Sequence, residues 1–122
     1  MDVSNPIPRR DGEEFVKKVN DEGGAGLVSV KLLPGAKIVR ASNGINFDKL
    51  AENAKKSDKV GVPIAGDDKG AIDVAEALTR EIGFEPVLVG GLAMGKYLVW
   101  GVPPLTGEHT PAELKQISST LK

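Results

Sequence analysis

Residues 60–91 constrain the fold most, because they read as two apolar strands joined by one helix. The stretch "VGVPIAG" predicts a buried strand, and "EPVLVGG" predicts another that ends at paired glycines. Between them, Asp67 or Asp68 is placed to cap a helix that Gly83 ends in the left-handed conformation. Its expected core stripe consists of Ile72, Ala75, Leu78 and Ile82. A strand, a helix and a strand of these lengths predict a parallel pair with a helical crossover.

The remaining elements are signalled more locally. We expect a helix that Asp11 caps together with Glu14 and that ends by Gly23. The stretch "GGAGLVSVKLLPG" fits a helix or an extended run, and we favour the helix. "AKIVRA" predicts a short buried strand, followed by a helix capped by Asn46 with Phe47, Leu50, Ala51 and Ala54 on one face. Thr110, Pro111 and Glu113 predict a capping box that opens a final helix.

These elements together predict an α/β fold, with a mostly parallel sheet of three to four strands and helical crossovers. Pro63 cannot donate a ladder hydrogen bond, so its position should lie at a sheet edge or a bulge. The sheet border beside "KIVRA" needs a further partner, since an uncovered edge is unusual in a parallel sheet. Asp2 and Val3 are too short a segment to supply a full strand.

Composition narrows the class of function. The chain has 122 residues and a formal net charge of -1, so we expect one domain and no binding of nucleic acid or anionic membrane. It has no cysteine and one histidine, His109, which argues against disulfides, thiolate chemistry and a histidine metal cluster. Without a signal-peptide pattern or an apolar run of membrane length, the default expectation is a cytoplasmic protein.

Four stretches taken in order carry a resemblance to a known family. They are "DVSNPIP", "LLPGAKIVRASNGINF", "VPIAGDDKGAIDVAEALTREIGFEPVLVGGLAMGKYL" and "PP". In order and spacing the chain resembles the second part of the NADP-dependent oxidoreductases that use the deazaflavin coenzyme F-420. The resemblance implies the second half of a Rossmann fold over residues 1–105. The tail lies outside the resemblance, and its capping box predicts that residues 106–122 form a C-terminal helix that packs on this domain.

The resemblance also implies cofactor contacts at three places. Asn5 and Pro6 are expected near the nicotinamide. Asn43, Gly44 and Ile45 are expected near the nicotinamide and the acceptor. Gly90, Gly91 and Leu92 are expected to lie against the deazaflavin. Each has an alternative role in the chain itself: an Asn-Pro turn, a loop dipeptide and an ordinary strand end. No catalytic side chain is implied, because hydride transfer requires mainly that two rings are held face to face.

This sequence departs from the family in several positions. Ser42 and Gly44 stand where relatives commonly have Phe and Thr, and Val99-Trp100 stands where relatives often have Glu. We expect Trp100 to serve packing, and Asp67 and Asp68 to serve capping.

The family's glycine-rich turn for the pyrophosphate is missing, and "GGAG" does not follow a strand, so it predicts a loop and a helix start. Two functions follow. One is an NADP and deazaflavin oxidoreductase domain that needs a complementary Rossmann half; the other is a non-catalytic truncated domain that acts as an interaction or dimerisation module.

Overall fold

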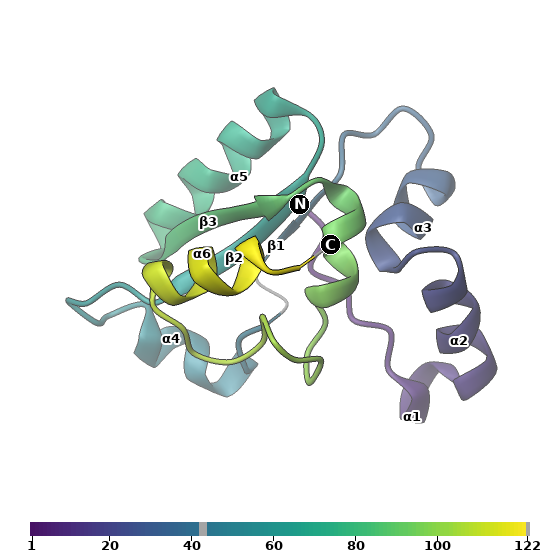
Figure 1. The fold of residues 1–122 in the computed structure, drawn as a ribbon, viewed down its shortest axis with the longest axis horizontal. Helices are drawn as coiled ribbons and strands as arrows, with labels where there is room; N and C mark the ends of the chain where they lie inside the picture. The colour runs from purple at the N-terminus through teal and green to yellow at the C-terminus, as the bar shows by residue number, and fades with distance from the viewer. Residues whose placement is uncertain (42–43, 122) are drawn as a thin grey trace.

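The structure is a computed structural model that describes residues 1–41 and 44–121. Its centre is a sheet of three strands in the order β1-β2-β3, with bounds Val39–Ala41, Gly61–Gly66 and Glu85–Gly90. Helix α5 (Lys69–Ile82) covers one face, and α6 (Pro111–Ser119) and the 3₁₀ segment η2 (Leu92–Tyr97) cover the other (Figure 1). The predicted α/β class is therefore confirmed.

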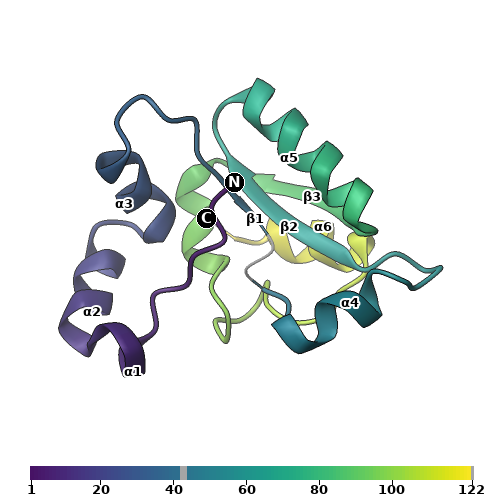
Figure 2. The ribbon, with the colours of Figure 1, turned by 180° about the vertical axis from the view of Figure 1, so that it is seen from behind.

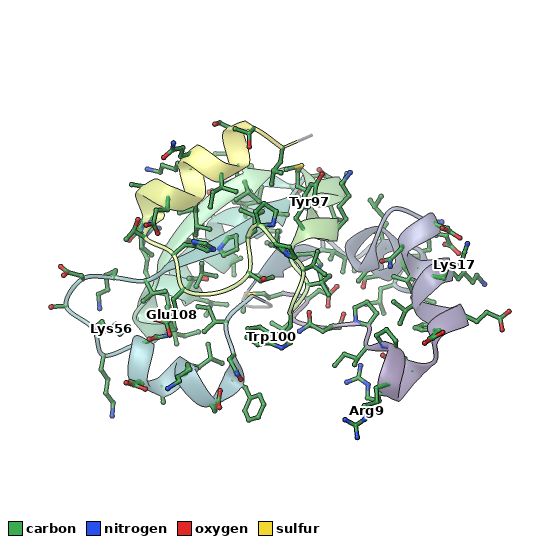
Figure 3. The ribbon with its side chains drawn as sticks, turned by 60° about the horizontal axis from the view of Figure 1, so that its bottom comes forward. Arg9, Lys17, Lys56, Tyr97, Trp100 and Glu108 are labelled. Atoms are coloured by element: carbon green, nitrogen blue, oxygen red, sulfur yellow. The ribbon has the colours of Figure 1, made fainter. Side chains whose placement is uncertain are left out.

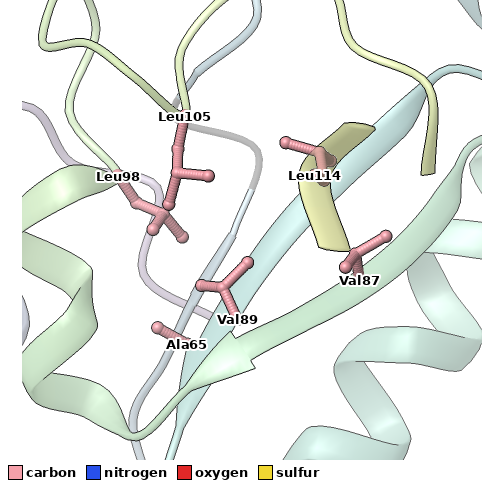
Figure 4. Packing of buried hydrophobic residues seen from close by; sticks show 6 residues of the cluster. All are labelled: Ala65, Val87, Val89, Leu98, Leu105 and Leu114. Carbon is pink, nitrogen blue, oxygen red and sulfur yellow. The ribbon is translucent and has the colours of Figure 1, made fainter. Parts of the chain in front are cut away.

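The two faces of the sheet follow from the alternation of side chains along the strands. Ile64 of β2 packs with Ile72 and Ala75 of α5. Its neighbour Ala65 points to the other side, into the cluster drawn in Figure 4. That cluster contains Ala65, Val87, Val89, Leu98, Leu105 and Leu114, so it joins β2, β3 and α6 to the segment after η2.

The β2–α5–β3 unit forms as predicted. β2 and β3 are parallel, with Gly61 opposite Glu85. Asp68 is the residue that caps α5, because its carboxylate accepts the Ala71 N–H at 2.9 Å. Gly83 ends the helix at φ 115°, and a Cβ there would lie 2.4 Å from the carbonyl oxygen of Ala54. Only glycine satisfies both requirements.

The predicted core stripe of α5 is right in its first half and wrong in its second. Ile72 and Ala75 are buried, but Leu78 and Ile82 are 43% and 56% exposed. Thr79 is buried in their place and donates its hydroxyl to the Ala75 carbonyl at 2.7 Å. The apolar residues of α5 extend beyond the part of the helix that packs on the sheet. The flank that carries Leu78 and Ile82 therefore stays uncovered.

The prediction of a mostly parallel sheet is wrong at β1, and the sheet is mixed. β1 pairs with β2 antiparallel, with Val39 opposite Gly66 and Ala41 opposite Ile64. The connection to β2 holds only the 3₁₀ turn η1 (Phe47–Lys49) and the four-residue α4 (Leu50–Asn53). These lie at one end of the sheet in Figure 1, so the chain returns at that end without the long crossover that a parallel pair requires.

Pro63 lies in the central strand rather than in an edge strand. In the described residues, pairing with β1 begins one residue later, at Ile64, and the pairing with β3 shifts register between Ile64 and Ala65. The irregularity expected from proline is therefore next to it, but the strand itself is central.

The N-terminal third forms three helices, α1 (Pro8–Asp11), α2 (Glu13–Asp21) and α3 (Ala25–Leu32), so the preference for a helix in "GGAGLVSVKLLPG" is confirmed. Asp11 does not cap α2, because Gly12 at φ 92° takes the N-cap position. Its carboxylate instead accepts the Ile7 N–H at 2.8 Å. The hydrogen bond from the Arg10 side chain lowers the pKa of Asp11 to about 2.

Two further capping predictions have opposite outcomes. Asn46 makes no side-chain cap, and Phe47 after it is 85% exposed, so the amphipathic helix expected there is only the short η1 and α4. The capping box of α6 is confirmed: Thr110 accepts the Glu113 N–H at 3.2 Å, and Glu113 accepts the Thr110 N–H at 2.8 Å.

Candidate functional site

The antiparallel β1 decides where the predicted site residues lie. In a parallel sheet the chain segments that follow the strands would gather at one edge. Because β1 runs the other way, Gly44 and Ile45 leave the sheet at the end opposite to Gly90 and Gly91. The structure therefore does not bring these two groups together.

The turn after β3 is occupied by contacts within the chain. The Leu92 N–H donates to Asp67 Oδ1 at 2.9 Å, and a Cβ on Gly91 would lie 2.6 Å from that same oxygen. Gly90 has φ 147°, and a Cβ there would lie 2.7 Å from Cγ of Met94. The glycines thus permit the turn to pack on its own neighbours, and Leu92 is buried.

At the other end, a cavity of about 540 Å³ brings two predicted residues together, Asn5 and Ile45. Trp100 lies beside them, and Figure 3 shows it between the α4 region and the α1–α2 helices. We call this the Trp100 cavity; its lining residues are Val3, Asn5, Ile7, Ile45, Asn46, Phe47, Leu50 and Trp100. Its walls are apolar or aromatic, with two side-chain amides as the polar groups.

Trp100 lies partly at the surface, since the residue is 46% exposed. Its backbone N–H donates to Asn5 Oδ1 at 3.1 Å, which fixes the amide of Asn5 at the cavity rim. Pro6 lies in a neighbouring cavity of about 600 Å³ that Trp100 also lines, with Lys96 and Tyr97. There the Lys96 ammonium is 5.0 Å from the centroid of the Tyr97 ring.

Gly44 belongs to neither cavity. Its carbonyl accepts the Gly107 N–H at 2.8 Å, and a Cβ on it would lie 3.2 Å from the Leu105 carbonyl oxygen. The loop before α6 therefore holds this part of the chain. Asn43, predicted to contact the cofactor, and Ser42 lie outside the described residues.

Arg40 is the residue that the sequence analysis missed. It is fully buried in β1, between Val39 and Ala41, on the face away from α5. Its Nη1 donates to the Ser4 carbonyl at 2.8 Å and to Asp2 Oδ2 at 3.1 Å, and its Nη2 donates to the Leu98 carbonyl at 2.6 Å. One guanidinium thus holds two of the three chain segments that line the Trp100 cavity, the one at Ser4 and the one at Leu98.

A sequence signal for Arg40 exists in hindsight. A single arginine inside the apolar run "KIVRA" must find acceptors once the strand is buried. One acceptor is Asp2, whose carboxylate also accepts the Ser29 hydroxyl at 2.9 Å. Burial raises the pKa of Asp2, but the hydrogen bonds from Ser4 and the charge of Arg40 outweigh it, so the pKa is lower than usual.

The helix start that follows β2 does not suit a phosphate group. A dinucleotide pyrophosphate needs free N–H groups at such a helix N-terminus. Here the Asp68 carboxylate accepts the Ala71 N–H and so occupies the position, while the Asp67 carboxylate accepts the Leu92 N–H of the turn after β3. "GGAG" is a loop and helix start, as predicted, since α3 begins at Ala25 directly after α2.

Metal and membrane features are absent from the described part of the chain. No group of three or more His, Asp and Glu side chains is placed to hold a metal ion there. No helix in residues 1–41 and 44–121 is both long and apolar enough to cross a bilayer.

Comparison with solved structures finds proteins of similar fold. No protein-family model and no curated protein matches the sequence. The hypothetical protein SMa0349 from Sinorhizobium meliloti is similar over 89% of this chain, with 25% identity and a TM-score of 0.68. A "putative F-420 dependent NADP-reductase" from Arthrobacter sp. FB24 is similar over 58% of this chain, with 20% identity and a TM-score of 0.51.

The chain spans 53% of the Sinorhizobium protein and 33% of the Arthrobacter protein. At 20% identity the second likeness concerns the fold alone. The fold is thus similar to part of a protein described as an NADP reductase.

Proposed function

We propose that this chain supplies the acceptor-facing wall of an NADP-dependent oxidoreductase of the deazaflavin type. Hydride would pass between the nicotinamide and a deazaflavin, F-420 or a similar acceptor, and that chemistry belongs to the two rings. The observation that supports the proposal most is the Trp100 cavity, where Asn5 and Ile45 meet on a fold similar to a reductase.

The residues of the cavity fit a flat ring. Trp100 and Phe47 offer aromatic surface, while Asn5 and Asn46 offer amides at the rim. Such a combination of apolar walls and few polar groups orients a ring and keeps water away from it. Gly90, Gly91 and Leu92 stay a predicted cofactor contact, now at the far end of η2 from this cavity.

The start of α5 does not suit the pyrophosphate of NADP, because the Asp68 carboxylate already caps it. We therefore propose that a complementary Rossmann half holds the dinucleotide. For this chain alone we expect weak or no NADPH binding by calorimetry, and a micromolar dissociation constant would refute that part.

Ring binding is testable by fluorescence, because Trp100 is the only tryptophan of the chain. Titration with F-420 should quench its emission in a saturable way. Phe47→Ala should weaken binding about fivefold, as expected for the loss of about 1 kcal/mol of aromatic contact. Leu88→Ala, at an exposed site on β3, is the matched control and should bind normally.

An amide NMR titration locates the ligand. Shifts at Asn5, Ile45 and Trp100 would support the cavity, while shifts confined to Gly90–Leu92 would move the proposed site to the turn after β3. Emission unchanged at millimolar F-420 would refute the ring site. The second function expected from the sequence, an interaction module, is favoured by the exposed apolar side chains of Met1 and Val3 beside β1.

A further inference from the structure

The N-terminal segment separates two cavities. Figure 2 shows it leaving the sheet beside β1 and running to α1, and Ile7 just before that helix is extended, with φ -124° and ψ 116°. Successive side chains of an extended segment point to opposite sides. Asn5 and Ile7 line the Trp100 cavity, whereas Pro6 and Pro8 line the neighbouring cavity of about 600 Å³. The two cavities therefore lie back to back.

Trp100 is the common edge of the two cavities, since it lines both of them and is itself partly exposed. We call the second one the Lys96 cavity; its lining residues are Pro6, Pro8, Val16, Asn20, Lys96, Tyr97, Val99, Trp100 and Val102. Because the shared wall reaches the surface at Trp100, one ligand can occupy both cavities by passing over this edge.

The two cavities differ in charge. None of the described residues that line the Trp100 cavity is charged. Among those that line the Lys96 cavity, Lys96 is charged and no residue is acidic. The Trp100 cavity therefore suits the uncharged flat part of a ligand, and the Lys96 cavity suits an anionic group attached to that part.

The base of Lys96 is held firmly in the fold. A Cβ on Gly24 would lie 3.1 Å from the Lys96 Cα, so the start of α3 packs directly on this residue. On the other side Gly95 is buried, and a Cβ on it would lie 3.0 Å from Cγ of Arg40. At the end of the side chain, the ammonium lies 5.0 Å from the centroid of the Tyr97 ring, a cation–π contact. The positive charge is thus presented from a fixed place.

The charge of Lys96 has no carboxylate partner among the residues that the structure describes. Other lysines do pair: the Nζ of Lys17 lies 2.6 Å from Asp21, and that of Lys69 lies 2.7 Å from Asp73. The face of Tyr97 attracts the ammonium but supplies no counter-charge. An anion that approaches Lys96 would therefore displace no other ion.

We propose that the Lys96 cavity binds a phosphate group carried on a side arm of the same ligand whose flat ring enters the Trp100 cavity. The inference rests on the proposed function, which assigns the ring to that cavity. The Lys96 ammonium pairs with the phosphate, and Asn20 offers a side-chain amide in the same wall. The ligand class is thus a flat heterocycle with a phosphorylated arm, as in flavin mononucleotide (FMN), rather than a neutral ring alone.

The test compares riboflavin with FMN by calorimetry, because these ligands share the ring and the side arm and differ only in the phosphate. FMN should bind about fivefold more tightly, as expected for an exposed ion pair. Added salt should reduce this difference. Lys96→Met should abolish the difference and leave the affinity for riboflavin unchanged. Lys115→Met on α6, at an exposed lysine that lines neither cavity, is the matched control and should keep the difference.

A ring variant separates the two contributions to binding. Phe47→Ala should weaken both flavins by the same factor, since Phe47 lines the Trp100 cavity and not the Lys96 cavity. Circular dichroism confirms that each variant is folded. Equal affinities for the two flavins, or a difference that survives Lys96→Met, would overturn the inference and leave the ring site standing. Saturable binding of neither flavin would also overturn it, and the F-420 titration decides the proposed function separately.

Discussion

Replacing Arg40 with methionine tests whether one buried side chain holds the N-terminal segment in place. Methionine keeps the aliphatic bulk that packs against Gly26 and Gly95, but it removes every hydrogen bond of the guanidinium. The variant therefore separates the polar contacts from the packing.

The magnitude follows from the groups that lose their partner. Removing one member of a buried ion pair costs about 3–5 kcal/mol, because the other charge stays desolvated. Asp2 keeps its hydrogen bonds from Ser4 and Ser29, so we expect the lower part of that range, about 3 kcal/mol. Part of this value comes from the Leu98 carbonyl, which loses a 2.6 Å charged donor.

The assay is equilibrium unfolding in urea, followed by Trp100 fluorescence and by circular dichroism. The Trp100 signal reports on the N-terminal segment, because the backbone N–H of Trp100 is bonded to Asn5 and the residue shares a cavity with Val3 and Asn5. Lys17→Met is the control, because its pair with Asp21 is exposed on α2, and its midpoint should not change.

Asp2→Asn supplies the double-mutant cycle. The double variant with Arg40→Met should be less destabilised than the sum of the two single variants, since the unpaired charge is gone. A loss below about 1 kcal/mol for Arg40→Met, or strict additivity with Asp2→Asn, would refute the reasoning.

Three further outcomes follow from local geometry. In the folded protein the pKa of Asp2 is lower than its ordinary 3.8. The stability that the Asp2 carboxylate adds to the fold should therefore be complete above pH 3.8 and be lost as the pH falls through the folded pKa. Asp2→Asn should remove this part of the acid unfolding curve. Gly83→Ala should cost at least about 1 kcal/mol in urea unfolding, since its Cβ meets the Ala54 carbonyl. Gly70→Ala should be neutral or stabilising, because a Cβ there makes only an ordinary contact of 3.4 Å with Asp68 Oδ1. Thr110→Ala should cost about 1 kcal/mol of unfolding free energy, and an unchanged midpoint would contradict the capping box.

The parts of the fold that sequence predicted well are those with local causes. Asp68 and Gly83 delimit α5 through contacts within a few residues, and Thr110 does the same for α6. In these cases the residue type and the backbone conformation determine each other, so a short stretch is sufficient. The parallel pairing of β2 and β3 follows from the helix between them.

The errors have non-local causes. The direction of β1 depends on how the chain returns from it, and the periodicity of "AKIVRA" is the same in both directions. The spacing of Leu78 and Ile82 predicts an apolar face but not how much of it the sheet covers. Asp11 has the spacing of a cap, yet Gly12 intervenes.

The candidate site was predictable only in part, for the same reason. Asn5 and Ile45 meet at the Trp100 cavity, but their neighbour Trp100 is far along the chain, and only the structure shows that it lines the same cavity. The family resemblance implies that Gly90 and Gly91 contact the deazaflavin of the same cofactor pair, but the antiparallel β1 puts Ile45 at the other end of the sheet. The direction of one three-residue strand therefore keeps these predicted contacts apart.

The contacts of Asp2 have a practical consequence for anyone who prepares this protein. A fusion partner or affinity tag joined ahead of Met1 would emerge beside the β1 border of the sheet, within reach of Val3 and Ile82. Such an addition would alter the surface that Met1 and Val3 form there, and its effects on mass or affinity would then be misread as properties of the polypeptide itself. Purification handles belong after α6, and any leader sequence should be cleaved before mass or affinity is recorded.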